Sequence, residues 1–255
     1  MLHAIEILGI KITPYSINDF IEIINENIIN RHELIQQTGV NAYTIVSLQK
    51  DNNLRTAINK SQLVNVDGMS VAWALKFLGY KNVSKASCPD IFNQLMELSV
   101  EKGFHPFFLG ATPEVIDQAV KNLQVKFPKI EIAGYHHGYF TDNESANIAS
   151  LIKDSKPDML FLGISSPKKE LFSEKHIDFM QVPYTFGVGG VFDIIAGITK
   201  RAPLWMQNSG LEWFYRFLQE PRRMWKRYLV TNSLFIYYVL KEKFTRRINQ
   251  NPTDN

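Results

Sequence analysis

Short apolar segments alternate with segments of helical spacing along most of this chain, and this alternation limits the possible folds more than any other feature. The apolar runs at residues 104–109, 159–164 and 184–188 are too short for helices, and each is followed by a turn and then by a helical pattern. Strands that alternate with helices in this way form a mostly parallel sheet with helices on both faces. The sequence therefore predicts an α/β, Rossmann-like core.

Further elements complete this expected core. Short apolar runs predict a hairpin or paired strands at residues 4–8 and 9–13, and three more strands at residues 33–37, 63–66 and 130–133. Hydroxyl side chains followed by Asp, Pro or Glu are typical of helix starts, and they occur at Ser16 with Asp19, Thr112 with Pro113, and Thr141 with Glu144. We expect the helix after Thr141 to bury Ile148, Leu151 and Ile152.

Size and composition favour one large cytoplasmic domain, alone or with an appendage. The chain has 255 residues, of which 45% are hydrophobic, enough to bury a substantial core. Its single cysteine, Cys88, excludes an internal disulfide framework and suits a reducing compartment. Residues 1–12 have no basic segment, and Glu6 and Lys11 interrupt their apolar run, so we expect no signal peptide.

A glycine turn follows the apolar run at residues 184–188. In Gly187-Val188-Gly189-Gly190, the missing side chains let the backbone approach a ligand, and a short helix is predicted to begin near Val191. Free N–H groups between a strand and a helix favour an anion, usually a phosphate. Asp193 would then accept hydrogen bonds from a base or a ribose. The alternative is a tight turn that binds nothing.

Polar residues also stand where two other predicted strands end. Thr38 and Asn41 follow the run at residues 33–37, and Asp67 with Gly68 follows the run at residues 63–66. Ligands of open parallel sheets bind at the carboxyl ends of the strands, where catalytic carboxylates also collect. The alternative for both Asn41 and Asp67 is simple helix capping.

Several familiar site patterns are missing from the sequence. His136 and His137 are adjacent, so they point to opposite faces of an extended segment, and no further histidine has metal-ligand spacing. There is no Asp-x-Asp pair to hold Mg²⁺ on a diphosphate. Neither a dinucleotide-binding GxGxxG, a GxSxG elbow nor a GxxxxGK[ST] loop is present. We therefore expect no metal and no cofactor.

The character of the chain changes after Arg201. Residues 200–255 contain 11 Lys+Arg against 4 Asp+Glu, and tryptophan and tyrosine are interleaved with the arginines. Helices are predicted at residues 212–219 and 222–244, and the apolar run at residues 228–240 is too short to cross a bilayer. Such a segment is typical of a helix that lies in a membrane interface. Alternatives are an ordinary solvated helix pair and a nucleic-acid-binding surface.

These observations divide the chain into an α/β core at residues 1–200, a basic aromatic helical appendage at residues 201–247, and a disordered tail at residues 248–255. One functional class consistent with them is a nucleotide- or nucleic-acid-binding protein that uses the basic segment and has no transferase activity.

A set of motifs in a fixed order favours an enzyme instead. These motifs are Asn41-Ala42, Val66-Asp67-Gly68, His136-His137-Gly138-Tyr139-Phe140, Pro167-Lys168 with Glu170, Gly187-Val188-Gly189-Gly190 with Phe192-Asp193, Arg201-Ala202-Pro203 with Trp205-Met206-Gln207, Leu211-Glu212-Trp213, Tyr215-Arg216, and Gln219-Glu220-Pro221-Arg222-Arg223. From about Asn41 to Tyr228 the chain resembles the WecG/TagA/CpsF family of bacterial glycosyltransferases, which includes an N-acetylmannosaminyltransferase of teichoic acid synthesis.

The resemblance implies an inverting, metal-independent hexosyltransferase of cell-surface polysaccharide, capsule or teichoic acid synthesis. It implies a UDP-sugar donor, with N-acetylmannosamine or a related sugar, and a polyprenyl-diphosphate-linked sugar acceptor. It also implies that the appendage places the protein peripherally on the inner face of the cell membrane and helps to complete the active site. No nucleic acid partner is implied, and the oligomeric state stays open, with a homo-oligomer among the options.

The resemblance also assigns roles to residues. Asp67 matches the carboxylate proposed as the general base, and Arg216, Arg222, Arg223 and Arg227 would bind the diphosphate or the lipid head group. Thr38 and Asn41 would line the donor sugar, and Tyr139 and Asp193 the nucleotide. The full set of expected substrate-binding residues is Thr38, Asn41, Gly68, Lys85, Asp90, Gly110, His137, Gly138, Tyr139, Pro167, Lys169, Glu170, Gly187, Gly189, Gly190, Phe192 and Asp193.

The chain departs from the family pattern at three places. Lys169 replaces the usual glutamine of Pro-Lys-Gln-Glu, Lys85 replaces an arginine, and Thr38 lies one residue further from Asn41 than in the commoner Thr-x-Asn. Lysine only donates hydrogen bonds and adds a charge, whereas glutamine donates and accepts. We hypothesise that Lys169 contacts a diphosphate oxygen or a carboxylate of the donor sugar.

Overall fold

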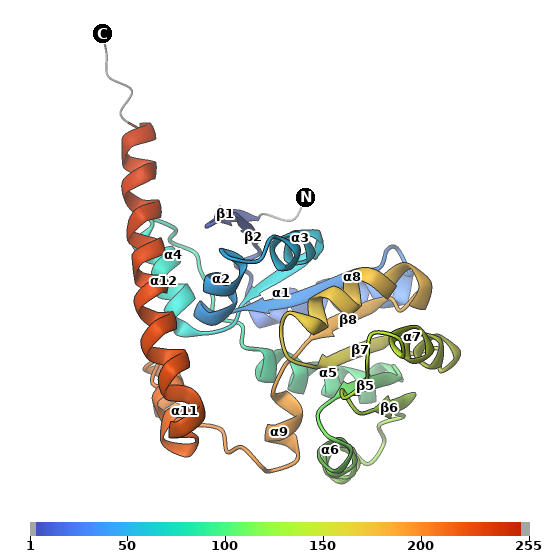
Figure 1. Cartoon of the computed structure of the whole chain (residues 1–255). Helices are drawn as coiled ribbons and strands as arrows, with labels where there is room; N and C mark the ends of the chain where they lie inside the picture. Colours follow the sequence, from blue (N-terminus) through green and yellow to red (C-terminus); the bar gives the residue numbers. More distant parts are fainter. Residues whose placement is uncertain (1–3, 251–255) are drawn as a thin grey trace.

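In the computed structural model of the protein, a six-stranded parallel sheet forms the centre of the molecule (Figure 1). The structure describes residues 4–250, except for the side chains of Arg223, Lys226, Arg227 and residues 247–250. The strand order is β4-β3-β8-β7-β5-β6, and every pairing is parallel. The strands are β3 (Ile35–Val40), β4 (Leu63–Val66), β5 (Pro106–Gly110), β6 (Gly134–His136), β7 (Met159–Gly163) and β8 (Tyr184–Gly187). The predicted α/β class is confirmed.

Helices cover both faces of this sheet, as predicted. The face covered by α1 (Ile17–Asn30), α5 (Cys88–Lys102) and α6 (Pro113–Lys126) holds an aromatic cluster in which Phe92 packs edge-on against Phe161, with ring centroids 4.9 Å apart. The opposite face packs leucines of β7 against α7 (Ser145–Asp154) and α8 (Lys168–Met180). Beyond them lie α2 (Ala42–Leu48), α3 (Asn52–Lys60) and α4 (Met69–Phe77).

The N-terminal hairpin is also confirmed. Strands β1 (Ile5–Ile7) and β2 (Ile10–Ile12) pair antiparallel, and their isoleucines are buried while Glu6 and Lys11 face outward. Ser16 caps α1 in a complete capping box with Asp19, so the predicted helix start is correct.

Two strand predictions were misplaced. The strand expected at residues 33–37 is β3, which begins at Ile35 and continues to Val40. Polar side chains at Gln37 and Thr38 indicated the end of the strand, but both are buried and hydrogen-bonded inside the protein. The strand expected at residues 130–133 lies at β6, where Gly134 leaves room for the ring of Phe107. Leu151, expected to be buried, is 42% exposed, while Ala149 takes its place in the core.

The C-terminal part forms an appendage on one side of the core (Figure 1). After α9 (Val191–Ile195), it consists of α10 (Leu204–Asn208), α11 (Glu212–Gln219) and α12 (Pro221–Gln250). Phe235 and Val239 anchor α12, because they pack in one apolar cluster with side chains of α2 and α4, and Met224 is also buried. Within residues 4–250, no helix combines the length and the apolar character needed to cross a membrane. The predicted disordered tail began too early, because residues 248–250 belong to α12, while residues 251–255 lie outside the described residues.

Candidate functional site

The loops predicted to form the site meet at the carboxyl edge of the sheet. Asn41 follows β3, and Asp67 follows β4. Lys169 lies in the first turn of α8, the helix after β7, and the glycine turn follows β8. Strands β4, β3, β8 and β7 are direct neighbours, so these loops are adjacent in space. The sequence-based expectation that one sheet edge carries them is confirmed.

Asp67 is a half-buried carboxylate with one oxygen firmly held. Its Oδ1 accepts the Cys88 N–H at 3.0 Å, and Asn41 Nδ2 approaches Oδ2 at 3.5 Å. Asp67 does not cap α4, because Gly68 occupies the N-cap position. Asn41 caps α2, because its Oδ1 accepts the Thr44 N–H at 3.2 Å, so the capping alternative is observed for this residue. Its contact with a donor sugar stays a prediction. The geometry leaves Oδ2 of Asp67 as the less engaged oxygen.

Cys88 begins α5 and separates Asp67 from the glycine turn. Its sulfur lies 4.0 Å from the Gly187 carbonyl oxygen and 3.9 Å from Asn65 Nδ2. Burial, together with the nearby charge of Asp67, raises the pKa of this thiol well above its ordinary value. Cys88 is therefore a neutral packing group at the site.

The glycine turn presents fewer free donors than its sequence indicates. The N–H groups of Val188 and Gly189 both donate to the Leu162 carbonyl. The expectation of a free N–H for an anion is therefore wrong at Gly189. Phe192, expected to touch substrate, is 1% exposed and packs in the aromatic cluster because Gly163 leaves space for its ring. It supports the turn from within the core.

Two charged groups border the turn at Gly190. A Cβ atom built on Gly190 would lie 3.4 Å from Arg216 Nη2 and 3.6 Å from Asp193 Oδ2. The Nε atom of Arg216 is buried and has no hydrogen-bond partner among the described residues. Asp193, from α9, and Arg216, from α11, thus lie beside the glycine turn. Their contacts with the nucleotide and the diphosphate stay predictions.

Lys169 and Glu170 point into the protein interior. Lys169 is 7% exposed and Glu170 1%, and the Lys169 ammonium is paired with Glu170 Oε1. The stem of Lys169 lies over Gly187, where an added Cβ would meet Cε at 2.9 Å. A small pocket beside this pair is lined by Gln36, Gln37, Thr38, Leu162, Lys169, Glu170, Ser173 and Gly187. In this structure the Lys169 charge therefore faces Glu170 instead of an open donor site.

Thr38 shares this buried position. It is 2% exposed, and its hydroxyl is hydrogen-bonded to that of Ser61 at 3.0 Å. Because β3 runs on to Val40, Thr38 is inside the strand and not in the loop where a donor sugar was expected to meet it.

The histidine segment after β6 lies against β5 and α8. Gly138 approaches Gly110 so closely that an added Cβ would lie 3.0 Å from the Gly110 Cα. Lys168, next to Pro167, donates to the Gly138 carbonyl at 3.4 Å and sits over the Phe140 ring at 3.8 Å. Within this segment Tyr139 is 71% exposed, and His137 Nδ1 is buried with no hydrogen-bond partner in the described part of the chain.

Lys85 and Asp90 take part in ion pairs that reach the appendage, and their expected contacts with substrate stay predictions. Lys85 pairs with Glu212 at 3.3 Å, and Arg201 pairs with Asp90 at 2.5 Å. Burial raises the pKa of Asp90, but hydrogen bonds from Arg201 and Ser87 outweigh that effect, so its pKa lies below the ordinary value. Cys88, Arg201 and Glu212 received no site role from the sequence, although Arg201 and Glu212 stand in two of the ordered motifs.

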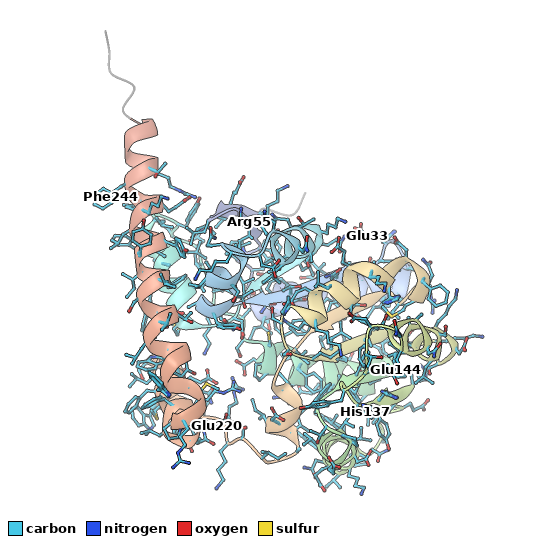
Figure 2. All side chains as sticks on the ribbon, in the orientation of Figure 1. Glu33, Arg55, His137, Glu144, Glu220 and Phe244 are labelled. Atoms are coloured by element: carbon cyan, nitrogen blue, oxygen red, sulfur yellow. The ribbon has the colours of Figure 1, made fainter. Side chains whose placement is uncertain are left out.

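The other arginines lie on α12. Arg222 is exposed near its first turn, and the side chains of Arg223 and Arg227 lie outside the described residues. Figure 2 shows Phe244, near the other end of this helix, pointing away from the core, and it is 62% exposed. The appendage thus combines arginine with exposed aromatic groups.

Comparisons with known proteins agree with this arrangement. Residues 5–249 match the Glycosyl transferase WecG/TagA/CpsF family. A Bacillus subtilis (strain 168) protein named N-acetylglucosaminyldiphosphoundecaprenol N-acetyl-beta-D-mannosaminyltransferase is 30% identical over 224 residues, 86% of each chain. The protein of the same name from Bacillus spizizenii (strain ATCC 23059 / NRRL B-14472 / W23) is 34% identical over 186 residues, 73% of this chain and 71% of that protein.

Proposed function

Because this chain belongs to the WecG/TagA/CpsF family of glycosyl transferases and is a hexosyltransferase, we propose that it moves N-acetylmannosamine or a related sugar from a UDP-sugar to a polyprenyl-diphosphate-linked sugar. The two relatives are named for N-acetylmannosaminyl transfer to N-acetylglucosaminyldiphosphoundecaprenol. The pathway is the synthesis of a teichoic acid or another cell-surface polysaccharide.

The observation that carries the proposal is the setting of Asp67. One carboxylate oxygen is held by the first N–H of α5, and the other is only weakly engaged. A general base needs such an oxygen within hydrogen-bonding reach of the attacking group. In the proposed single displacement, Asp67 Oδ2 takes the proton of the acceptor hydroxyl, the acceptor oxygen bonds to C1 of the sugar, and the bond from C1 to UDP breaks with inversion.

The departing diphosphate requires positive charge. Arg216 stands beside Gly190 with a buried Nε that no described residue satisfies, so a phosphate oxygen is a suitable partner for it. Arg222, with Arg223 and Arg227, supplies further cationic groups on α12. We propose that these side chains, with no metal ion, stabilise the leaving group. Tyr139 and Asp193 are proposed to hold the nucleotide.

The exposed apolar surface of the appendage supports contact with a membrane. Large side chains that are more than half exposed occur on α10, α11 and α12, and they include Leu204, Trp205, Leu218, Trp225 and Leu229. Aromatic and apolar groups next to arginines suit the interface between lipid tails and phosphates. We propose that the protein is cytoplasmic and binds peripherally to the inner face of the membrane, where the lipid-linked acceptor resides.

The test is a transfer assay with the full-length chain. A panel of UDP-sugars is supplied with a short-chain lipid diphosphate that carries N-acetylglucosamine, and both released UDP and the glycosylated lipid are quantified. The proposal predicts acceptor-dependent UDP release, fastest with UDP-N-acetylmannosamine or a close relative. Absence of transfer from every UDP-sugar, with steeply salt-dependent RNA binding instead, would contradict it.

A further inference from the structure

A chain of ion pairs connects the appendage to the segment that holds Asp67. Glu212, the first residue of α11, lies between two cations: its Oε2 is 3.3 Å from Lys85 Nζ, and its Oε1 is 3.6 Å from Arg201 Nε. Arg201 continues the chain, because its guanidinium donates to Asp90 Oδ1 at 2.5 Å and to Ser87 Oγ at 3.2 Å. Glu212 is thus tied to the start of α5.

The start of α5 is also the element that orients Asp67. Ser87 is the N-cap residue of this helix, and its hydroxyl is hydrogen-bonded to Asp90. Cys88, between them, donates its N–H to Asp67 Oδ1 at 3.0 Å. Arg201 therefore holds Ser87 and Asp90, which flank the residue whose N–H binds Oδ1 of Asp67.

The cations in this series of ion pairs are partly shielded from solvent, so their pairing contributes to the local structure. The side chains of Lys85 and Arg201 are 17% and 20% exposed, and that of Glu212 is 34% exposed. Removing the Glu212 charge would leave these two partly buried cations without the anion that they share. Partly buried ion pairs of this kind differ from fully exposed pairs, which contribute little to stability. We expect Arg201 to reorient and the segment from Ser87 to Asp90 to shift with it.

We propose that Glu212 is a positioning residue for Asp67, acting from the appendage through Arg201 and the first turn of α5. This inference rests on the proposed function only where it concerns catalysis. Docking of α11 would then orient the general base, so that turnover depends on the appendage even when the acceptor is water-soluble. A misplacement of about 1 Å at a reacting group costs about 10²-fold in rate, so a smaller shift is expected to cost about tenfold.

The single cysteine of the chain allows a direct structural test. Protein labelled with ¹⁵N only in cysteine gives one backbone amide signal, that of Cys88, whose N–H binds the Asp67 carboxylate. The Asp67→Asn variant calibrates how far this signal moves when the charged acceptor is lost. We expect Glu212→Gln to move the signal in the same direction by a measurable part of that distance.

Glu242→Gln is the matched control. Glu242 is also an appendage carboxylate, and it pairs with Arg246 at 2.9 Å within α12, away from the start of α5. The Cys88 signal should keep its position in this variant. An unchanged Cys88 signal in Glu212→Gln, or an equal shift in Glu242→Gln, would overturn the inference.

Kinetics with a water-soluble acceptor, without vesicles, test the catalytic part. Glu212→Gln should lower kcat about tenfold and leave KM for the UDP-sugar within about twofold, because positioning of the base affects the transition state more than donor binding. Equal kcat values for Glu212→Gln and Glu242→Gln, in an assay where the wild type transfers sugar, would refute the inference alone. A wild type that transfers nothing would refute the proposed function, while the Cys88 signal would still report on the structural link.

Discussion

The thiol of Cys88 occupies the space that a side chain on Gly39 would need. A Cβ atom built on Gly39 lies 2.3 Å from Cys88 Sγ, a separation that real Cβ contacts do not adopt, and 3.2 Å from the Cβ of Asp67. The position of the proposed base therefore depends on the missing side chain at residue 39 and on the cysteine that fills the gap. These three residues come from β3, from the loop after β4 and from α5.

This contact predicts a coupled effect on stability. Gly39→Ala should lower the free energy of unfolding by about 1–3 kcal/mol, as overpacked cores do. In a Cys88→Ala background the same change should cost clearly less, because the closest clashing atom is gone. A double-mutant cycle measured by urea unfolding checks this. Strictly additive effects would show that Cys88 does not limit the space at residue 39.

Asp90 predicts a pH-dependent contribution to stability. Its pKa lies below the ordinary value of 3.8 in the folded state, because hydrogen bonds from Arg201 and Ser87 outweigh the effect of burial. The carboxylate therefore stabilises the fold above its unfolded pKa, and this contribution is lost as the pH falls through the lower folded pKa. Since its side chain is 36% exposed, solvent screening limits the contribution to about 1 kcal/mol.

The measurement compares wild type with Asp90→Asn by urea unfolding across pH. The difference in the free energy of unfolding should be constant from about pH 7 to about pH 5 and should shrink below about pH 4. A difference that persists unchanged into the acid range would mean that the carboxylate charge is not its source.

The fold was largely predictable from the sequence because its signals are local. Capping residues such as Ser16 and Thr112 mark helix starts within one turn, and short apolar runs mark the central strands. The misplaced strand at β3 has a physical reason. Gln37 binds Asn65 and Tyr184, residues far away in the chain, so its burial depends on partners that no local pattern reveals.

The candidate site was predictable only in part, for the same reason. The meeting of Asp67, Asn41 and the glycine turn at one edge was predictable, because a parallel sheet brings its strand ends together. The ion pairs of Lys85 with Glu212, and of Arg201 with Asp90, join residues more than 100 positions apart, so sequence spacing could not indicate them. Likewise, Lys169 is next to Glu170 in sequence, but only the structure shows that both side chains turn inward.

The exposed leucines of the appendage predict membrane binding. Leu218 and Leu229 are 60% and 66% exposed, so changing them to serine should not destabilise the fold. Each change should weaken binding to vesicles containing anionic lipid by about tenfold, the effect of withholding one large apolar side chain from the interface. Val125→Ser, on α6 and 80% exposed, is the control and should bind as the wild type does. Equal losses in all three variants would place the membrane surface elsewhere.

Stabilisation of the leaving group by arginine, and not by a metal, predicts the effect of a chelator. Turnover should be unchanged by EDTA and should not require added Mg²⁺. Arg216→Met should lower kcat by about 10²-fold or more, because a charge-assisted contact that forms as the diphosphate departs would be lost. Loss of activity in EDTA, with recovery on adding a divalent cation, would contradict this part of the account.

Asp67→Asn is the change that tests the central claim most directly. Asparagine keeps an oxygen for the Cys88 N–H but cannot take a proton from the acceptor, so the fold and UDP binding should be retained. Turnover of UDP-N-acetylmannosamine with the soluble lipid-diphosphate acceptor should fall by about 10²–10⁴-fold, the usual contribution of a general base. An Asp67→Asn enzyme that transfers sugar at the wild-type rate would show that Asp67 is not the base and that the site described here does not perform the reaction.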